Sequence, residues 1–535
     1  MVGVAGKSQA CNTCRKRRVK CDLGRPSCLK CTTSNRACTG YDRDLIFVNR
    51  TPSDPSSTAT SVLSQIKAQQ RLKDAKKEAD LHHLFTESSH KSRDFRHYAV
   101  ELLEAIYLPK KPVSSSYNTK TSGGGFSWVY CLKDLVAPSK SLNTALFAFC
   151  LVQLHITGAG NASLYECLDQ YNTALQHLYA DLADPERQFL EETLAAILVL
   201  STCELFVCPT ENGWSVHARG IAEILRLRDQ RMASTPAWRH LFSRLRIVCT
   251  LEALTKRQAD FLENNIWRQI VNESNLDDAL GEVYQMIADI PTLLEQVVSL
   301  PSIGDRNILL KESADIVRSI LAKVKSIKSW YDNFWKNSPT PRSWLVPSCA
   351  SNLADVDPTN KVFSSCFEFE SLSVAATVVM CWSVAAQLYS NVIQIHSLVQ
   401  ARLDRHIALE DLLAQVDTTV VDASSRLEAS SQNTLLREIQ SEGTKMARNI
   451  CQSMEYYHRI EMGTYGSHGI TYPSWSARQY FRLHPGHEQE WSWLQNMHKM
   501  EGPGTRWGLS TMAFADIVEP LGGWSSYCDS SKYYW

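Results

Sequence analysis

The chain has 535 residues, of which 44% are hydrophobic and 21% are charged. These proportions are typical of a folded protein and exclude a largely disordered or fibrous chain. The length allows about three to five domain-sized units of roughly 100–200 residues each. The formal net charge is zero, so the whole-chain charge gives no indication of a nucleic-acid partner.

The charge is nevertheless distributed unevenly along the chain. Residues 1–50 contain eleven Lys or Arg against three Asp, a local balance of +8, so the remaining residues carry −8. A basic head on an acidic body predicts that the N-terminal part binds a polyanion and that the larger part has another task. Residues 1–10 hold no apolar run long enough for a signal peptide, so we expect no entry into the secretory pathway.

Six cysteines near the N-terminus form an internal repeat. The spacing Cys-x2-Cys-x6-Cys occurs twice, with six residues between the copies, in Cys11, Cys14, Cys21, Cys28, Cys31 and Cys38. A structural zinc ion takes four ligands in a tetrahedron and prefers thiolates. Six cysteines supply the eight ligand positions of two zinc ions only if two sulfurs bridge both metals. The repeat therefore predicts a binuclear zinc cluster, with folding and metal binding as one event because the segment has almost no other apolar residues.

Other interpretations of the repeat are weaker. A redox Cys-x2-Cys motif needs a thioredoxin-like βαβ context, which the surrounding sequence does not offer. Iron–sulfur clusters use different cysteine spacings. The other eleven cysteines are scattered singly, several of them in apolar segments, which is typical of buried thiols in a reducing compartment rather than of disulfides.

The motif as a whole resembles the fungal zinc binuclear cluster family. The resemblance rests on Cys11-Asn-Thr-Cys14-Arg-Lys-Arg-Arg-Val-Lys-Cys21 and on Gly24-Arg-Pro26-Ser-Cys28-Leu-Lys-Cys31 with Cys38. It implies that Cys11 and Cys28 bridge the two zinc ions. It also implies that Cys14 and Cys21 complete one site, that Cys31 and Cys38 complete the other, and that Pro26 lies in the loop between the repeats. Family members bind double-stranded DNA at CGG-type half-sites, which we expect here too.

The basic residues lie mainly in the first repeat. Its six-residue loop holds five Lys or Arg, whereas the second loop holds only Arg36, so charge alone predicts that the first repeat faces DNA. By resemblance, Arg17 and Arg18 read base edges, as an Arg can donate to guanine O6 and N7. The expected phosphate contacts are Arg15, Lys16, Lys20 and Lys30. Part of this charge offsets the net −2 of six thiolates with two Zn²⁺, and the run can overlap with a nuclear import signal.

The next segments are expected to connect this module, residues 1–43, to the rest of the chain. Residues 44–60 are polar, with two prolines and a Ser/Thr-rich run, which predicts a flexible linker. Residues 61–85 have a helical composition. Their best heptad frame reaches barely two heptads with small core residues, fewer than the three to four of a stable coiled coil. A homodimer and a monomer therefore both remain open.

Residues 86–535 are expected to form one large all-α regulatory domain. Apolar residues recur with helical spacing in three stripes: Tyr98, Leu102, Leu103 and Ile106; Leu190, Leu194, Ile197, Leu198 and Leu205; and Ile221, Ile224 and Leu225. Segments 141–165 and 371–401 carry no charged residue and are long enough to span a bilayer. Their polar residues favour buried core helices instead, so no membrane segment is predicted.

Two motifs in this domain have both a structural and a functional interpretation. Trp214-x2-His217-x2-Gly220 is similar to a helix in the regulatory regions of the fungal factors, and we expect a packed helix with Gly220 at a close contact. His484-x2-His487-Glu488 has the residue types of a metal site, but the intervening Pro-Gly indicates a loop. The chain has no phosphate-binding Gly loop, nucleophile elbow or His-Glu-x2-His motif.

The sequence therefore predicts a nuclear, zinc-dependent, sequence-specific regulator of RNA polymerase II genes that is not an enzyme. In this family the usual role is activation, often of a metabolic or secondary-metabolite gene cluster, with the transcription machinery as partner. Two alternatives stay open. One is a DNA-binding protein without a regulatory role, and the other is an enzyme that the zinc module targets to DNA.

Overall fold

The computed structural model divides the chain into two compact units, Met1–Lys67 and Ala68–Trp535, which are described separately. In the first unit, the described residues are 11, 13–14, 17, 19–24, 28–34, 36 and 38. In the second they are 92–110, 125–207, 213–227, 235–259, 279–357, 359–403, 406–414, 433–507 and 521. The predicted linker 44–60 and helix 61–85 lie outside the described residues, so the domain boundaries expected there stay predictions.

The small unit is organised around cysteine rather than around apolar side chains. Its described buried residues are Cys11, Cys14, Cys28 and Cys31, with Cys21 and Cys38 packed against them. Val19, Leu23 and Leu29 are 38%, 46% and 67% exposed. Within the described residues the unit therefore has no hydrophobic core other than the sulfurs, as the composition predicted.

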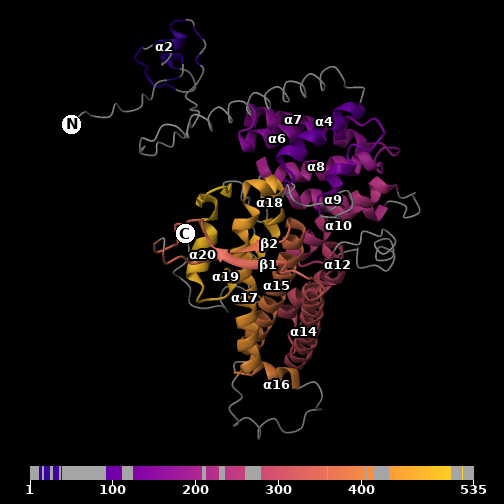
Figure 1. The fold of residues 1–535 in the computed structure, drawn as a ribbon, viewed down its shortest axis with the longest axis vertical. Helices are drawn as coiled ribbons and strands as arrows, with labels where there is room; N and C mark the ends of the chain where they lie inside the picture. Colours follow the sequence, from indigo (N-terminus) through magenta and orange to yellow (C-terminus); the bar gives the residue numbers. More distant parts are fainter. Residues whose placement is uncertain are drawn as a thin grey trace, which may run out of the picture. The chain divides into compact units, whose positions relative to one another are not determined.

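The large unit is mostly helical (Figure 1). Its helices are α4 (Ser92–Ile106), α5 (Ser127–Cys131), α6 (Lys140–Thr157), α7 (Leu164–Ala183), α8 (Glu191–Val207), α9 (Gly213–Leu227), α10 (Pro236–Lys256), α12 (Ala279–Met286), α13 (Ile290–Ser299), α14 (Arg306–Lys336), α15 (Leu372–Leu403), α16 (Leu409–Ala414), α17 (Thr434–Tyr457), α18 (Gly463–Gly469), α19 (Thr471–Leu483) and α20 (Glu488–Gln495). The short 3₁₀ turns are η2 (Leu300–Ser302), η3 (Ile460–Met462) and η4 (Met497–Lys499). A small module followed by a largely helical domain confirms the predicted fold class.

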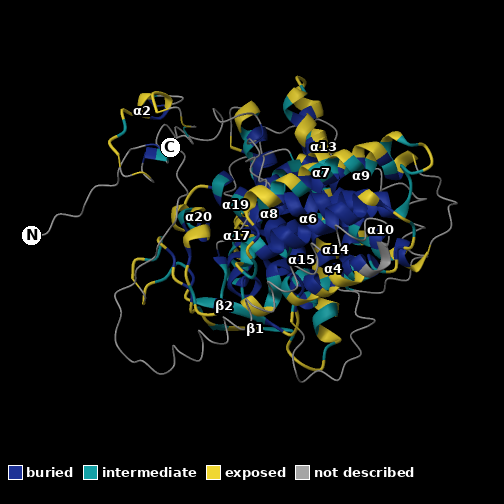
Figure 2. Cartoon of the chain, turned by 90° about the horizontal axis from the view of Figure 1, so that it is seen from above, coloured by how far each residue is buried: buried dark blue, intermediate teal, exposed yellow. Residues whose placement is uncertain are grey.

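One group of helices surrounds α6, which contacts α4, α7 and α8. The Ser139 hydroxyl accepts a hydrogen bond from the Leu142 amide at 3.1 Å and so caps the start of α6. Gly158 ends the helix with a φ of 62°, which a residue without a Cβ adopts at little cost. Residues 141–154 of α6 are all buried between its neighbours, and Figure 2 shows the helix in the colour of buried residues. The charge-free segment that begins at residue 141 is thus a core helix.

A second group surrounds α15, which contacts α14, α17 and α19. Helices α14, α15 and α17 run side by side, with α16 near one end (Figure 1). In the described part of the chain, α15 is the one helix long and apolar enough to cross a membrane by length and composition. However, 89% of its apolar window is buried inside the protein. The second charge-free segment is therefore a core helix as well, as its polar residues indicated.

A β-hairpin departs from the expected all-α domain. Strands β1 (Ser343–Pro347) and β2 (Ser365–Phe369) pair antiparallel, with Ser343 opposite Phe369 and Pro347 opposite Ser365. Strand β2 packs against α17; Phe369 contacts Tyr456 with ring centroids 5.2 Å apart. No strand was expected anywhere in residues 86–535. Each strand has five residues and the partners are far apart in sequence, so no sustained alternating pattern marked them.

The predicted apolar stripes are mostly in the core, with two corrections. Leu102 and Leu103 are buried in α4, but Tyr98 is 48% exposed and the core-facing neighbours are Phe95 and Ala99. Tyr98 was therefore wrongly assigned to the core, whereas Leu102 and Leu103 were assigned correctly. The expected close contact at Gly220 is wrong, because a Cβ added there would meet no atom within 4 Å.

Candidate metal centre and nucleic-acid interface

The six cysteines gather into two overlapping groups. Cys11, Cys14, Cys21 and Cys28 form one group, and Cys11, Cys28, Cys31 and Cys38 form the other; in each, all four sulfurs lie within 4.8 Å of one another. Cys11 and Cys28 belong to both groups. Two four-ligand sites that share two sulfurs are what two zinc ions require from six cysteines.

The distances between the sulfurs fit tetrahedral zinc. With zinc–sulfur bonds of about 2.3 Å, the edge of a tetrahedron of sulfurs is about 3.8 Å. The Sγ atoms of Cys11 and Cys28 are 3.6 Å apart, those of Cys14 and Cys28 are 3.6 Å apart, and those of Cys11 and Cys31 are 3.8 Å apart. The pair Cys11–Cys28 is common to both groups, Cys14–Cys28 belongs to the first group and Cys11–Cys31 to the second. The sulfurs of each group are therefore spaced as a zinc ion requires.

Backbone geometry and a metal charge together favour thiolates at this site. The Cys14 amide donates to the Cys11 sulfur at 3.3 Å, and the Cys11 amide donates to the Cys21 sulfur at 3.5 Å. Without a cation, desolvation raises the pKa of Cys14 to about 12 and that of Cys28 above its ordinary range. Zinc ligands must be deprotonated, so bound metal is what would keep these sulfurs ionised.

Asp22 connects the two repeats, which the sequence analysis did not anticipate. Its carboxylate accepts hydrogen bonds from the backbone amides of Leu29 at 2.9 Å and Lys30 at 3.0 Å, at the start of α2 (Leu29–Thr32). These two donors lower the pKa of Asp22. The only sequence signal was its position directly after Cys21. Asp22 therefore positions the second Cys-x2-Cys turn relative to the first repeat.

The basic residues expected to contact DNA are described only in part. Arg17, Lys20 and Lys30 are exposed, so their charges are accessible to a polyanion. The Arg17 Nη1 donates to the Ser34 hydroxyl at 3.3 Å, across from the first repeat to the second. Outside the described residues lie Arg15, Lys16, Arg18 and Pro26.

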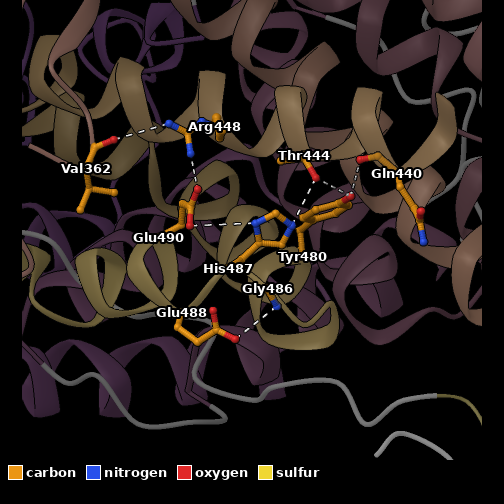
Figure 3. A network of polar contacts seen from close by, with 9 residues as sticks. All are labelled: Val362, Gln440, Thr444, Arg448, Tyr480, Gly486, His487, Glu488 and Glu490. Atoms are coloured by element: carbon orange, nitrogen blue, oxygen red, sulfur yellow. Dashed lines mark hydrogen bonds and ion pairs between the residues drawn. The ribbon is translucent and has the colours of Figure 1, made fainter. Parts of the chain in front are cut away.

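The His484–Glu488 segment is a structural polar network rather than a metal site (Figure 3). The His484 Nε2 lies 2.9 Å from the Ser390 hydroxyl, and burial lowers the pKa of His484 to about 3. The His487 Nε2 lies 3.3 Å from the Thr444 hydroxyl. Glu488 accepts a hydrogen bond from the Gly486 amide at 3.2 Å. Within the described residues, the groups of side chains able to hold a metal consist only of the six cysteines.

Family models match both units of the chain. The fungal Zn(2)-Cys(6) binuclear cluster domain matches residues 9–45, and this domain binds two zinc ions through six cysteines. The fungal specific transcription factor domain matches residues 114–428, more than half of the chain. The chain belongs to this fungal transcription factor family. The family match covers α5 to α16 and stops before α17.

Curated relatives match shorter stretches. The transcriptional regulatory protein moc3 of Schizosaccharomyces pombe is 61% identical over 31 residues, 6% of each chain. The arginine metabolism regulation protein II of Saccharomyces cerevisiae is 44% identical over 54 residues, 10% of this chain and 6% of that protein. An uncharacterised protein of Emericella nidulans is 24% identical over 199 residues, 36% of this chain and 43% of the relative. The matches span less than half the length of each of these relatives. No solved structure matches the chain.

Proposed function

We propose that this chain is a zinc-dependent, sequence-specific DNA-binding regulator of RNA polymerase II transcription that acts in the nucleus. The observation that carries the proposal is the pair of four-cysteine groups that share Cys11 and Cys28, in a chain that also contains the large helical family domain. A protein module of this size with a buried metal cluster and an exposed basic face is suited to a DNA groove rather than to catalysis.

In this proposal the cysteines and the basic residues have separate roles. Cys11 and Cys28 bridge the two zinc ions, Cys14 and Cys21 complete one site, and Cys31 and Cys38 complete the other. Arg17 and Arg18 contact guanine edges in the major groove of a CGG-type half-site. Phosphate contacts come from Arg15, Lys16, Lys20 and Lys30. The exposure of Arg17, Lys20 and Lys30 supports this assignment.

The contact between Arg17 and Ser34 suggests how Arg17 is held ready for DNA. A hydroxyl partner at 3.3 Å is a weak neutral acceptor, so a guanine edge or a phosphate can replace it at small cost. Arg17 and Arg18 are adjacent in sequence, and the proposal gives both of them a guanine contact. The roles of Arg17 and Arg18 in DNA binding can be tested by substituting each arginine alone.

The finer points of the proposal concern partners and targets. A homodimer would read two half-sites, with residues 61–85 as the connecting helix; a monomer would read one triplet. We propose that the helical domain contacts the transcription machinery and that the protein activates a metabolic or secondary-metabolite gene cluster. The name of one relative, arginine metabolism regulation protein II, is compatible with a metabolic target but names no target for this chain.

The competing functions make different predictions. A DNA-binding protein without a regulatory role would bind the same sites and leave transcription unchanged. An enzyme targeted by the zinc module would need a catalytic site in the helical domain, and the sequence of that domain contains no recognised catalytic motif. We therefore propose a regulator that is not an enzyme.

The decisive experiment maps the full-length protein across the genome and measures a reporter driven by the bound sites. We expect enrichment of CGG-containing sites and a change in reporter transcription that disappears in the Cys14→Ala variant. Bound sites without any CGG enrichment would contradict the DNA specificity. Bound sites with unchanged transcription would favour the non-regulatory alternative.

A further inference from the structure

A cavity of about 60 Å³ lies inside the helical unit, between α8, α9, α10, α12, α15, α17, α18 and α19. Its walls are largely apolar and aromatic, and include Leu205, Trp214, Ile247, Leu280, Tyr284 and Met380. At roughly 10–15 Å³ for each water position, this space holds about four to six water-sized positions. The cavity is therefore large enough for a small organic molecule.

One cationic side chain lines this cavity, and no acidic side chain does so among the described residues. Arg244 of α10 contributes the guanidinium, and the lining residues include neither Asp nor Glu. Arg244 has no ion pair in the described part of the chain; its contact is with His468 of α18, at 2.6 Å from Nη2 to Nε2. The Nε atom of Arg244 is buried without a hydrogen-bond partner.

The protonation state of His468 follows from its contacts. An Arg guanidinium only donates hydrogen bonds, so the His468 Nε2 accepts and its Nδ1–H donates to the Tyr107 hydroxyl at 2.7 Å. Burial and the charge of Arg244 hold the pKa of His468 well below its ordinary value. His468 is thus a neutral spacer that orients the guanidinium without compensating its charge.

A second polar group in the wall also has no partner. The Tyr457 hydroxyl, on α17, is buried without a hydrogen-bond partner, and Tyr457 is 1% exposed. The Tyr457 hydroxyl and the Nε atom of the half-buried Arg244 both lose hydration on folding, and both gain when an anion supplies acceptor oxygens. Two such groups beside an apolar wall form the recognition set for a carboxylate with a short hydrocarbon body.

We propose that this cavity binds a small monocarboxylate, with Arg244 pairing with the carboxylate, Tyr457 donating to it and the apolar wall taking the hydrocarbon part. A bound ligand would connect helices from α8 to α19 that otherwise meet around a partly empty space. Binding depends only on the helical unit. Failure of the DNA-binding proposal would leave it unaffected, and its own failure would leave DNA binding unaffected.

The test uses the full-length protein with isovalerate as the probe and isovaleramide, its neutral isostere, as the control ligand. Binding is measured by ligand-observed NMR titration and by the shift in melting temperature. We expect isovalerate to bind at least tenfold more tightly than the amide, because the amide has no charge to pair with Arg244. Equal affinity for acid and amide, or no binding of either, would overturn the proposal.

Variants locate the site. Arg244→Gln should weaken isovalerate about tenfold or more and bring the acid-to-amide ratio close to one. Arg239→Gln, an exposed arginine on the same helix, should change neither value. Tyr457→Phe should weaken the acid several-fold and provides a second test if Arg244→Gln does not fold. An unchanged acid-to-amide ratio in folded Arg244→Gln would place the anion elsewhere and refute the assignment.

Discussion

The same residue type has opposite roles in the two units of this protein. Among the described residues of the small unit, the buried ones are cysteines that lie beside one another. In the large unit, Cys150, Cys381 and Cys451 are buried singly among apolar side chains, and burial raises the pKa of Cys381 to about 12. The comparison teaches that burial of a thiol says little about its chemistry. Convergence of several sulfurs within van der Waals distance is what distinguishes a metal site from a core.

The largest expected effect comes from one substitution placed in each context. Cys14→Ala removes a zinc ligand from a unit whose described residues include no other core, so we expect loss of zinc, of the folded module and of DNA binding. Cys381→Ala leaves a small cavity in a large core and should cost on the order of 1 kcal/mol with normal DNA affinity. Zinc content and DNA affinity of the full-length variants are the measurements. Retained DNA affinity in Cys14→Ala would show that the basic run alone suffices.

For leucine, in contrast to cysteine, we expect the larger effect in the helical unit and the smaller effect in the zinc module. Leu388 of α15 is fully buried, and Leu388→Ala should lower the free energy of unfolding of the helical unit by about 2–5 kcal/mol. Leu29 of the zinc module is 67% exposed. Leu29→Ala should therefore change the stability of the zinc module by no more than about 0.5 kcal/mol. Denaturant unfolding followed by helical circular dichroism measures the first, and zinc affinity measures the second. A large loss of zinc affinity in Leu29→Ala would mean that apolar packing supports the module after all.

Acid should weaken the helical unit through its buried histidines. Burial lowers the pKa of His458 to about 4, whereas an unfolded histidine titrates near 6.5. The unfolded state therefore binds the extra proton first, and stability present above about pH 6.5 is lost as the pH falls toward 4. Between pH 7 and pH 5 this single group should remove about 2 kcal/mol of stability.

The control separates His458 from the other titrating groups. His458→Gln should show a smaller loss of unfolding free energy between pH 7 and pH 5 than the unmodified protein. His97→Gln, at an exposed position on α4, should show the unmodified loss. An identical pH dependence in all three proteins would argue against a depressed pKa at His458.

Two further variants separate base contacts from phosphate contacts within the module. Arg18→Ala should cost about 1–3 kcal/mol more on CGG-containing DNA than on scrambled DNA, as expected for loss of a bidentate guanine contact. Lys20→Ala should weaken both DNAs about equally and reduce the salt slope by about one unit. Affinities over a salt series measure both. If Arg18→Ala leaves the ratio of the affinities for CGG-containing and scrambled DNA unchanged, Arg18 does not read a base. Arg17 and Lys16 would then be tested for that role.

The metal centre and two of the long buried helices could be predicted from the sequence alone. The cysteine spacing repeats within 28 residues, and coordination requires only that local turns bring the sulfurs together. Counting ligands predicted two bridging positions, and the six cysteines form two four-cysteine groups that share two sulfurs. The charge-free segments contain the core helices α6 and α15, because their apolar residues favour burial and their polar residues disfavour a bilayer. In each case the physical constraint lies within one short stretch of chain.

Other features were decided by the tertiary structure alone. The hairpin pairs residues 343–347 with 365–369, and each strand is too short for its pattern to stand out. The cavity brings together Arg244 and His468, which are 224 residues apart, and places the Tyr457 hydroxyl beside an apolar wall. No sequence motif identifies these residues as a binding site, because their chemistry depends on the side chains that the folded helices place around them. That arrangement exists only once the helices have packed.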